Sequence, residues 1–249
     1  MRFRKLHSNL IFSLIVIILS SNKVSCQTHS DIKLHNWFDN IIGKENLAIN
    51  NGPLYSNPYR TIGKNDMYYI SDSYRKGTVS YDGQMYYDVD LKYNVFEDKL
   101  LLNPYGAFKN IVIVLAQDKI ASFTLNDAKF TKKETPQPIL TEFTNGYYET
   151  DSIKVNFILF TKHHKNIRKK IDNNGLYYSF MEDNLFFIEY KNIPYKINGK
   201  KDLIKVFPNH SKQIKEYYLI NRQILKSNKN QFMKNVMKQI STYISNDEK

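Results

Sequence analysis

The chain has 249 residues with 36 Lys or Arg against 24 Asp or Glu, which gives a formal net charge of +12. Its single cysteine, Cys26, excludes an internal disulfide framework. In a chain that is cleaved after this residue, a cysteine nucleophile and a thiolate zinc site are excluded as well. The length suits one large domain, and a core of that size needs no covalent staples.

Residues 1–26 are predicted to be a secretory signal peptide. Three basic residues near the start precede an apolar run from Leu10 to Leu19, and a polar segment follows. The run is too short to cross a hydrocarbon core of roughly 30 Å, which takes about 20 helical residues. We therefore expect an exported protein that is periplasmic, extracellular or associated with the outer membrane.

The residues around Cys26 leave two routes of processing open. Val24-Ser25-Cys26 fits cleavage by a signal peptidase, because small residues precede the cut. The KVSC segment also resembles a bacterial lipobox, whose cysteine is acylated and becomes a membrane anchor. Lys23 stands where that motif carries an aliphatic residue, so simple cleavage after Cys26 is favoured over a lipoprotein.

Residues 27–76 are predicted to be a loop-rich segment with one short helix. Asn51-Gly52-Pro53 and Asn57-Pro58 are turn signals. Apolar residues between Ile32 and Ile42 are spaced as one helical face and end at Gly43. We expect this helix to cover an end of the main sheet.

Residues 77–249 are predicted to form a single domain, in which a β meander (77–198) precedes C-terminal helices (201–245). Apolar residues alternate with polar ones from Thr78, and Asp82-Gly83 marks a hairpin turn. Asp151-Ser152 is predicted to be another turn. The expected strands are 78–82, 86–93, 99–102, 111–115, 120–125, 146–150, 153–161, 176–180, 185–190 and 195–197. The strands at 176–180 and 185–190 are expected to pair with each other around the MEDN turn.

After Gly199 the apolar residues recur at helical spacing, which predicts two helices that seal the apolar side of the sheet. Ser211 and Asn230 are the predicted N-caps, and Asn228 is a predicted stop. The predicted fold class is therefore α+β: a largely antiparallel β meander, shaped as a curved sheet or half-barrel, followed by two C-terminal helices.

Local motifs for catalysis or cofactors are missing. The sequence contains no G-x-S-x-G, G-x-x-x-x-G-K-[ST], G-x-G-x-x-G or H-E-x-x-H, so we expect no cofactor and do not favour an enzyme. His163-His164 lies in the basic stretch KHHKNIRKK (162–170). Adjacent strand residues point to opposite faces, so we expect an exposed loop and no metal site there.

Asp88 and Asp90 are the candidate catalytic pair. They are expected on one strand face, roughly 6.5 to 7 Å apart, which is compatible with acid and base roles in glycoside hydrolysis. A solvated strand face shows the same alternation, so the catalytic interpretation competes with a purely structural one.

The chain has 19 tyrosines, four of which lie on the first predicted hairpin. Tyr81, Tyr87 and Tyr93 fall on the apolar face and are predicted to line the core, whereas Tyr86 falls on the polar face. An aromatic ring with a hydroxyl also suits a pocket for a sugar, lipid or peptide. These four residues are therefore the candidate ligand-binding residues.

Two resemblances bear on these expectations. The pattern G-x-V-x-Y-x-G-x-x-Y-x-x-V-x-L-x-Y at 77–93, together with LIKVFPNHSKQIKEY at 203–217, resembles uncharacterised secreted proteins of Bacteroidota bacteria. That resemblance implies an envelope location and no particular activity. A curved antiparallel sheet with helices across its mouth is also similar to the half-barrels of periplasmic lipoprotein carriers, at the level of fold alone.

The expected function is that of a non-enzymatic binding or accessory protein of the cell envelope, whose partner is a protein, an apolar molecule or a glycan. An envelope-polymer glycoside hydrolase is one alternative. The other is a peripheral protein that contacts anionic lipid through its Lys-rich C-terminal helices. Export makes nucleic acid the least expected partner of the basic surface.

Overall fold

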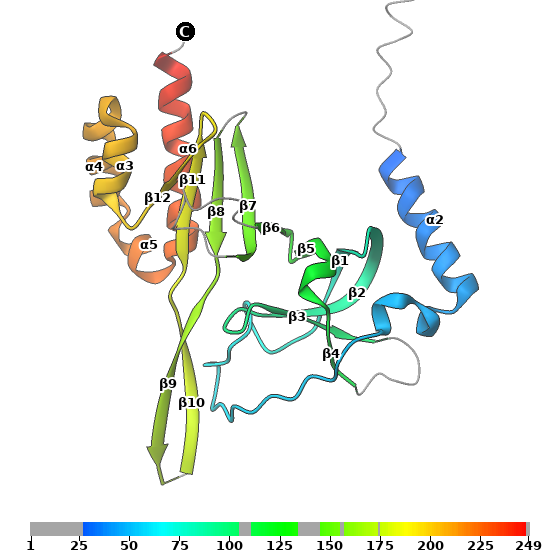
Figure 1. The fold of residues 1–249 in the computed structure, drawn as a ribbon. Helices are drawn as coiled ribbons and strands as arrows, with labels where there is room; N and C mark the ends of the chain where they lie inside the picture. Colours follow the sequence, from blue (N-terminus) through cyan, green and yellow to red (C-terminus); the bar gives the residue numbers. More distant parts are fainter. Residues whose placement is uncertain (1–26, 105–110, 134–144, 155–156, 174, 248–249) are drawn as a thin grey trace, which may run out of the picture. The chain divides into compact units, whose positions relative to one another are not determined.

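The computed structural model describes residues 27–104, 111–133, 145–154, 157–173 and 175–247 (Figure 1), so the predicted signal peptide and Cys26 lie outside the described residues. The helices are α2 (Gln27–Ile42), α3 (Lys200–Val206), α4 (Ser211–Ile220), α5 (Arg222–Ser227) and α6 (Lys229–Asp247), with short 3-10 turns at Lys44–Asn46, Ala48–Asn50, Gln117–Lys119 and Pro208–His210. The strands are β1 (Arg75–Tyr81), β2 (Gln84–Asn94), β3 (Lys99–Asn103), β4 (Ile113–Val114), β5 (Ile120–Leu125), β6 (Ala128–Lys133), β7 (Gly146–Lys154), β8 (Phe157–Lys162), β9 (Lys165–Asp172), β10 (Gly175–Glu182), β11 (Leu185–Tyr190) and β12 (Ile193–Lys196).

Ten of the described strands form one open antiparallel sheet in the order β12-β11-β8-β7-β6-β5-β1-β2-β3-β4. C-terminal helices follow the sheet in the chain, so the predicted α+β class with an antiparallel meander is confirmed. Two-residue turns close several hairpins: Asp82-Gly83, Asn126-Asp127 and Lys191-Asn192 all have positive φ at both positions. That conformation matches the right-handed twist of paired strands.

The core has two main parts. An aromatic-rich cluster lies along β1, β2, β3, β5, β6 and β7, where Phe123 and Phe130 stack at 4.7 Å. The other cluster joins β8, β11 and β12 to the C-terminal helices through residues such as Phe186, Phe232 and Val236. The helices therefore cover one end of the sheet, while the strands around Phe123 enclose their own core.

The C-terminal part contains four helices rather than the predicted two, because breaks at His210 and Asn221 divide the first apolar stripe. Asn228 ends α5 as predicted. Its side chain also accepts a hydrogen bond from the Gln231 backbone N–H at 2.9 Å, which caps α6. Asn230 was predicted as this cap but lies inside the helix.

The face assignment of Tyr86 and Tyr87 was wrong, because β2 contains a bulge. Gly77 pairs with Val89 and Val79 pairs with Tyr86, so one residue of β1 opposes two of β2. Asp88 has a φ of 55° at this point. The extra residue reverses the alternation, so that Tyr86 is buried and Tyr87 is only half-buried.

Three predictions in the second half of the meander were also wrong. Asp151-Ser152 is no turn, because both residues pair with β8 inside β7. The stretch 162–170 is no exposed loop: it contains the end of β8 and most of β9. β10 pairs with β9 rather than with β11, and β11 joins β8 and β12 in the main sheet. β9 was not predicted because most of its residues are exposed and polar or basic, so its sequence lacks the alternation of apolar and polar residues that indicates a half-buried strand.

A partly buried ion pair joins two regions of the main sheet that lie 64 positions apart. Lys162 Nζ lies 2.6 Å from Asp98 Oδ2, and the Tyr93 hydroxyl donates to the other carboxylate oxygen. Gly146 approaches this pair with a φ of +134°, and a Cβ there would lie 1.9 Å from Asp98 Oδ2. The backbone of β7 therefore needs glycine at this position.

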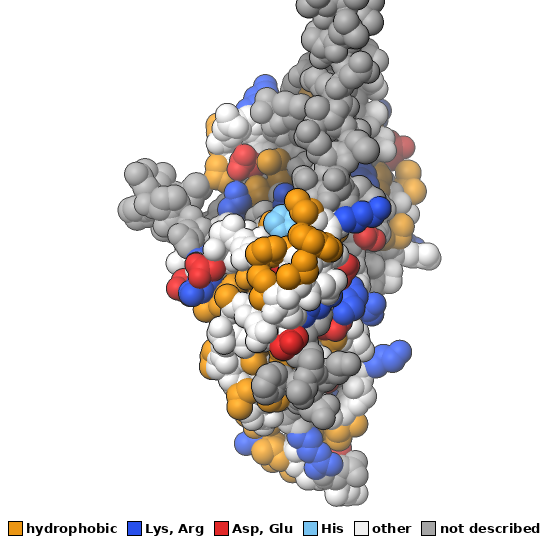
Figure 2. All heavy atoms as spheres, turned by 90° about the vertical axis from the view of Figure 1, so that its right-hand side faces the viewer, with side chains coloured by type: hydrophobic (Ala, Val, Ile, Leu, Met, Phe, Trp, Pro, Cys, Tyr) orange, Lys and Arg blue, Asp and Glu red, His pale blue; other side chains and the backbone are white. Residues whose placement is uncertain are grey.

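The helix α2 ends at Gly43, as predicted, and the chain forms a separate compact unit from Lys44 onward. Leu34, Trp37 and Ile41 of α2 are exposed. Figure 2 shows hydrophobic side chains gathered on the face of the molecule that it presents. That α2 covers an end of the main sheet stays a prediction. No helix in the described ranges is long and apolar enough to span a membrane.

Candidate functional site

A polar cleft of about 650 Å³ lies where β7, β9, β10 and the segments that follow β8 and β10 approach the turn between α5 and α6. Three separate parts of the chain form it: the segment around Tyr69, the sheet and the two helices. Polar and charged side chains dominate its wall. The lining residues are Tyr69, Ile70, Val95, Glu149, His163, Lys165, Glu182, Asp183, Asn184, Lys226, Ser227, Asn228, Lys229, Asn230, Gln231 and Lys234.

Glu149 lies at the centre of the polar wall and uses both carboxylate oxygens. Oε2 lies 2.6 Å from Nε2 of His163, and Oε1 accepts a hydrogen bond from Lys234 at 2.5 Å. The three residues come from β7, the end of β8 and α6. Glu149 is 3% exposed. Burial alone would raise its pKa, but His163 and Lys234 outweigh that effect and lower the pKa below its ordinary value. Glu149 is therefore a carboxylate at neutral pH.

This carboxylate determines which nitrogen of His163 carries a proton. A carboxylate can only accept, so Nε2 of His163 is the donor to Glu149. The ring makes no other hydrogen bond with the described residues. Tyr69 packs edge-on against it with ring centroids 4.7 Å apart, and Phe130 lies on it at 5.8 Å. His163 is thus fixed in orientation beside the cleft.

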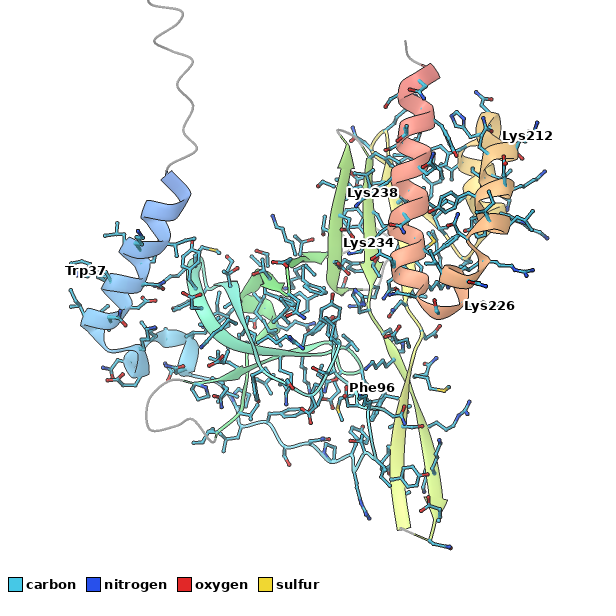
Figure 3. All side chains as sticks on the ribbon, turned by 180° about the vertical axis from the view of Figure 1, so that it is seen from behind. Trp37, Phe96, Lys212, Lys226, Lys234 and Lys238 are labelled. Carbon is cyan, nitrogen blue, oxygen red and sulfur yellow. The ribbon has the colours of Figure 1, made fainter. Side chains whose placement is uncertain are left out.

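Lys234 joins α6 to two carboxylates of β7 (Figure 3). Its Nζ lies 2.5 Å from Glu149 and 3.2 Å from Asp151. Burial would lower the pKa of Lys234, but these carboxylates outweigh it and hold the pKa above its ordinary value. Burial raises the pKa of Asp151, and the attraction of Lys234 offsets this only in part. The pKa values of Glu149 and Asp151, which lie two residues apart on β7, are thus shifted in opposite directions.

Lys165 holds the opposite wall of the cleft. This side chain is buried and donates to the backbone carbonyls of Asp66 at 2.9 Å and Tyr68 at 2.7 Å. Just beyond, the Ser71 N–H donates to the Tyr69 carbonyl at 2.8 Å, and Ile70 between them has a φ of 64°. This is a γ-turn of the rare form with positive φ. A β-branched residue in that conformation is strained, and such strain concentrates at binding sites.

Side-chain amides line the rim beside α6. Asn184 Nδ2 donates a hydrogen bond to Asn230 Oδ1 at 3.0 Å. This bond connects the turn before β11 to α6. Lys226 and Lys229 lie at the turn between α5 and α6, and Lys226 is labelled there in Figure 3. The Lys229 ammonium lies 5.2 Å from the Phe186 ring. The rim therefore offers both donors and acceptors, as well as positive charge.

The candidate residues from the sequence lie elsewhere. Tyr81, Tyr86 and Tyr93 are buried in the aromatic core, and Tyr87 is half-buried on β2. None of these four tyrosines lines the cleft. Their rings therefore contribute to packing at the positions they occupy.

The carboxylates Asp88 and Asp90 are also remote from the cleft. Asp88 is exposed in the bulge of β2, and Asp90 forms an ion pair with Lys76 at 2.8 Å. Within the described residues, no group of three His, Cys, Asp or Glu side chains is placed to hold a metal ion. Of the two adjacent histidines, His163 is buried at Glu149, which corrects its expected exposure.

Sequence analysis missed Glu149, Lys165 and Lys234 as members of a site. The spacing of Glu149 and Asp151 on one strand was a usable signal, but Lys234 lies 85 positions from Glu149. Comparison with known proteins adds no assignment: no family model, no curated protein and no solved structure matches the chain significantly.

Proposed function

We propose that this protein is an exported, non-enzymatic binding protein of the cell envelope, and that it holds a glycan partner in the polar cleft. The observation that carries the proposal is the fixed arrangement of Glu149, His163 and Lys234 in a wall of the cleft. The Glu149 carboxylate and the Lys234 ammonium form an ion pair, so each offsets the charge of the other. What remains for a ligand is the rest of the wall, where the side-chain amides of Asn184, Asn228 and Asn230 lie among charged side chains such as Lys226 and Lys229.

A polyhydroxyl ligand suits this wall better than an apolar one. Each sugar hydroxyl both donates and accepts, and the amides of Asn228, Asn230 and Gln231 offer both functions. An apolar ligand would leave these groups without partners when it displaced water, which is costly. The aromatic rings that a lipid carrier would use are packed into the core. We therefore favour the glycan over the apolar partner; a protein partner is the alternative for the same surface.

A glycan array tests the proposal with two matched variants. Ser227 is exposed on the rim, so Ser227→Trp should obstruct the cleft without touching the core. Ser73 is exposed and does not line the cleft, so Ser73→Trp carries the same change elsewhere. We expect wild type and Ser73→Trp to bind the same envelope glycans, and Ser227→Trp to lose them. Equal binding by all three, or no binding by wild type, would contradict the proposal.

A hydrolase of envelope polymers is the second candidate, and the opposite pKa shifts of Glu149 and Asp151 favour it. Neighbouring carboxylates with separated pKa values are a pattern of acid and base catalysis. His163, oriented by Glu149, would serve as the base that activates water. Release of reducing ends from a bound glycan would support hydrolysis if His163→Gln abolished it. Binding without any turnover by wild type would eliminate this candidate.

A further inference from the structure

The hairpin β9–β10 is an insertion between two neighbouring strands of the main sheet. β8 and β11 pair with each other, and residues 165–182 between them form their own two-stranded sheet (Figure 1). The ladder is regular from Lys165↔Glu182 to Asp172↔Gly175. Insertions of this kind leave the scaffold intact and are common carriers of function.

Within the described residues, hydrogen bonds to other segments support the base of the hairpin. The Tyr178 N–H donates to the Arg60 carbonyl at 2.8 Å, and the Phe180 N–H donates to the Asn65 carbonyl at 3.1 Å. Tyr178 pairs with Lys169, so the distal half of the hairpin begins at Lys170; there residues 170–173 and 175–176 are exposed, and Tyr177 is half-buried. An isolated two-stranded hairpin is marginally stable in water. Both faces of the distal half are therefore accessible to solvent or to a binding partner.

The exposed side chains of this distal half are apolar and basic. Ile171 and Leu176 face each other across the two strands near the turn and are 74% and 42% exposed. Lys170 precedes Ile171 on β9, and Arg168 and Lys169 come just before it, opposite the supported residues Ser179 and Tyr178; all three basic side chains are exposed. The tip thus presents an apolar pair, and behind it lies a row of three basic side chains that alternate between the two faces of the hairpin. Single exposed apolar residues are ordinary, but this combination is more specific.

We infer that the distal half of the β9–β10 hairpin docks on an anionic lipid surface. The apolar pair at the tip enters the boundary between head groups and acyl chains, and the row of basic side chains contacts anionic head groups. Asp172 is the one acidic residue between 166 and 181, and it accepts a hydrogen bond from Tyr177.

Charge complementarity favours a lipid surface over a protein that adds a strand. In the described part of the chain, β9 pairs only with β10, so its other edge is open. Three consecutive basic residues on an edge strand disfavour pairing with a further strand. The same residues are attracted to an anionic surface, where each adds to the binding free energy.

Sedimentation of the purified protein with lipid vesicles tests this inference. Wild type should bind vesicles of phosphatidylglycerol and phosphatidylethanolamine in equal parts, should not bind pure phosphatidylcholine, and should lose binding as salt increases. Replacement of Arg168, Lys169 and Lys170 by Ser should weaken binding at least about tenfold. Ile171→Ser with Leu176→Ser should weaken it as well.

The matched control lies on α4, where Leu219 and Ile220 are each 70% exposed among basic residues. Their double replacement by Ser should leave vesicle binding unchanged. The inference is overturned if wild type ignores the anionic vesicles, if both hairpin variants bind as wild type, or if the α4 variant alone loses binding. The last result would instead place the lipid contact on the C-terminal helices.

A second measurement does not depend on loss of binding. Leu176→Trp in a Trp37→Phe background places a single fluorophore at the tip, since Trp37 is the only tryptophan. Brominated phosphatidylglycerol in the vesicles should quench its emission. An unquenched signal from protein that sediments with the vesicles would overturn the inference.

Discussion

Replacement of Glu149 by Gln is the most informative single change in the cleft wall. Gln keeps the size of the side chain but offers one acceptor where His163 and Lys234 need two, so one buried donor faces the new amide N–H₂. Hydrogen bonds to charged groups contribute about 1.5 to 3 kcal/mol, and breaking a buried charge pair costs about 3 to 5 kcal/mol. Because Glu149 is almost inaccessible to water, we expect a loss of about 3 kcal/mol in the free energy of unfolding at pH 7.

Urea unfolding followed by circular dichroism measures this loss. The control is Glu216→Gln on α4, where the carboxylate is exposed. We expect the control to change the free energy of unfolding by less than about 0.5 kcal/mol. The reasoning is refuted if Glu149→Gln also changes the free energy of unfolding by less than about 0.5 kcal/mol, because the contacts of the carboxylate with His163 and Lys234 would then contribute nothing measurable to stability.

The pH dependence of the same variant provides an independent check. The pKa of Glu149 is lower in the folded protein than its ordinary value of 4.5. A lowered pKa in an acid stabilises the folded state above the unfolded pKa, and this stability is lost as the pH falls through the folded pKa. The gap in unfolding free energy between wild type and Glu149→Gln should therefore narrow as the pH falls below about 4.5. A gap that stays constant or widens there would contradict the ion-pair account.

Three further substitutions test the fold by urea unfolding. Gly146→Ala should destabilise the protein by more than about 2 kcal/mol, because its Cβ would overlap the partly buried Lys162–Asp98 ion pair, whereas Gly199→Ala meets nothing within 4 Å and should cost far less. Phe130→Ala should cost about 3 to 5 kcal/mol, since the ring is fully buried, and Ile193→Ala on the exposed edge strand less than about 1 kcal/mol. Asn228→Ala should cost about 1 kcal/mol through loss of the α6 cap. Equal losses within either matched pair, or no loss for the cap, would contradict the packing described.

The strands around the first hairpin could be predicted because one of their faces is buried. Period-two alternation identified β1, β3 and β5 closely, and the bounds of β5 agree at both ends. The bulge at Asp88 could not be foreseen, since a single residue in a left-handed conformation reverses every face before it. The strand β6 was missed because the turn residues Asn126-Asp127 were not recognised as a primed hairpin turn.

The candidate cleft could not be predicted from the sequence, for a different reason. Its central contacts join residues that are 14 and 85 positions apart, and no local pattern connects such residues. His163 was judged by its basic neighbours, but the sheet buries it while Lys169 and Lys170 remain exposed. Local sequence reports which residues alternate and which helices are amphipathic; it does not report which polar side chains tertiary packing brings together.

Hydrogen exchange in the presence of a bound envelope glycan tests the central claim most directly. If the cleft holds the glycan, backbone amides of residues 226–234 and of β7 should exchange more slowly in the complex, while residues 77–93 should be unchanged. Protection confined to the tyrosine-bearing hairpin at 77–93, or no change at the turn between α5 and α6, would contradict the account.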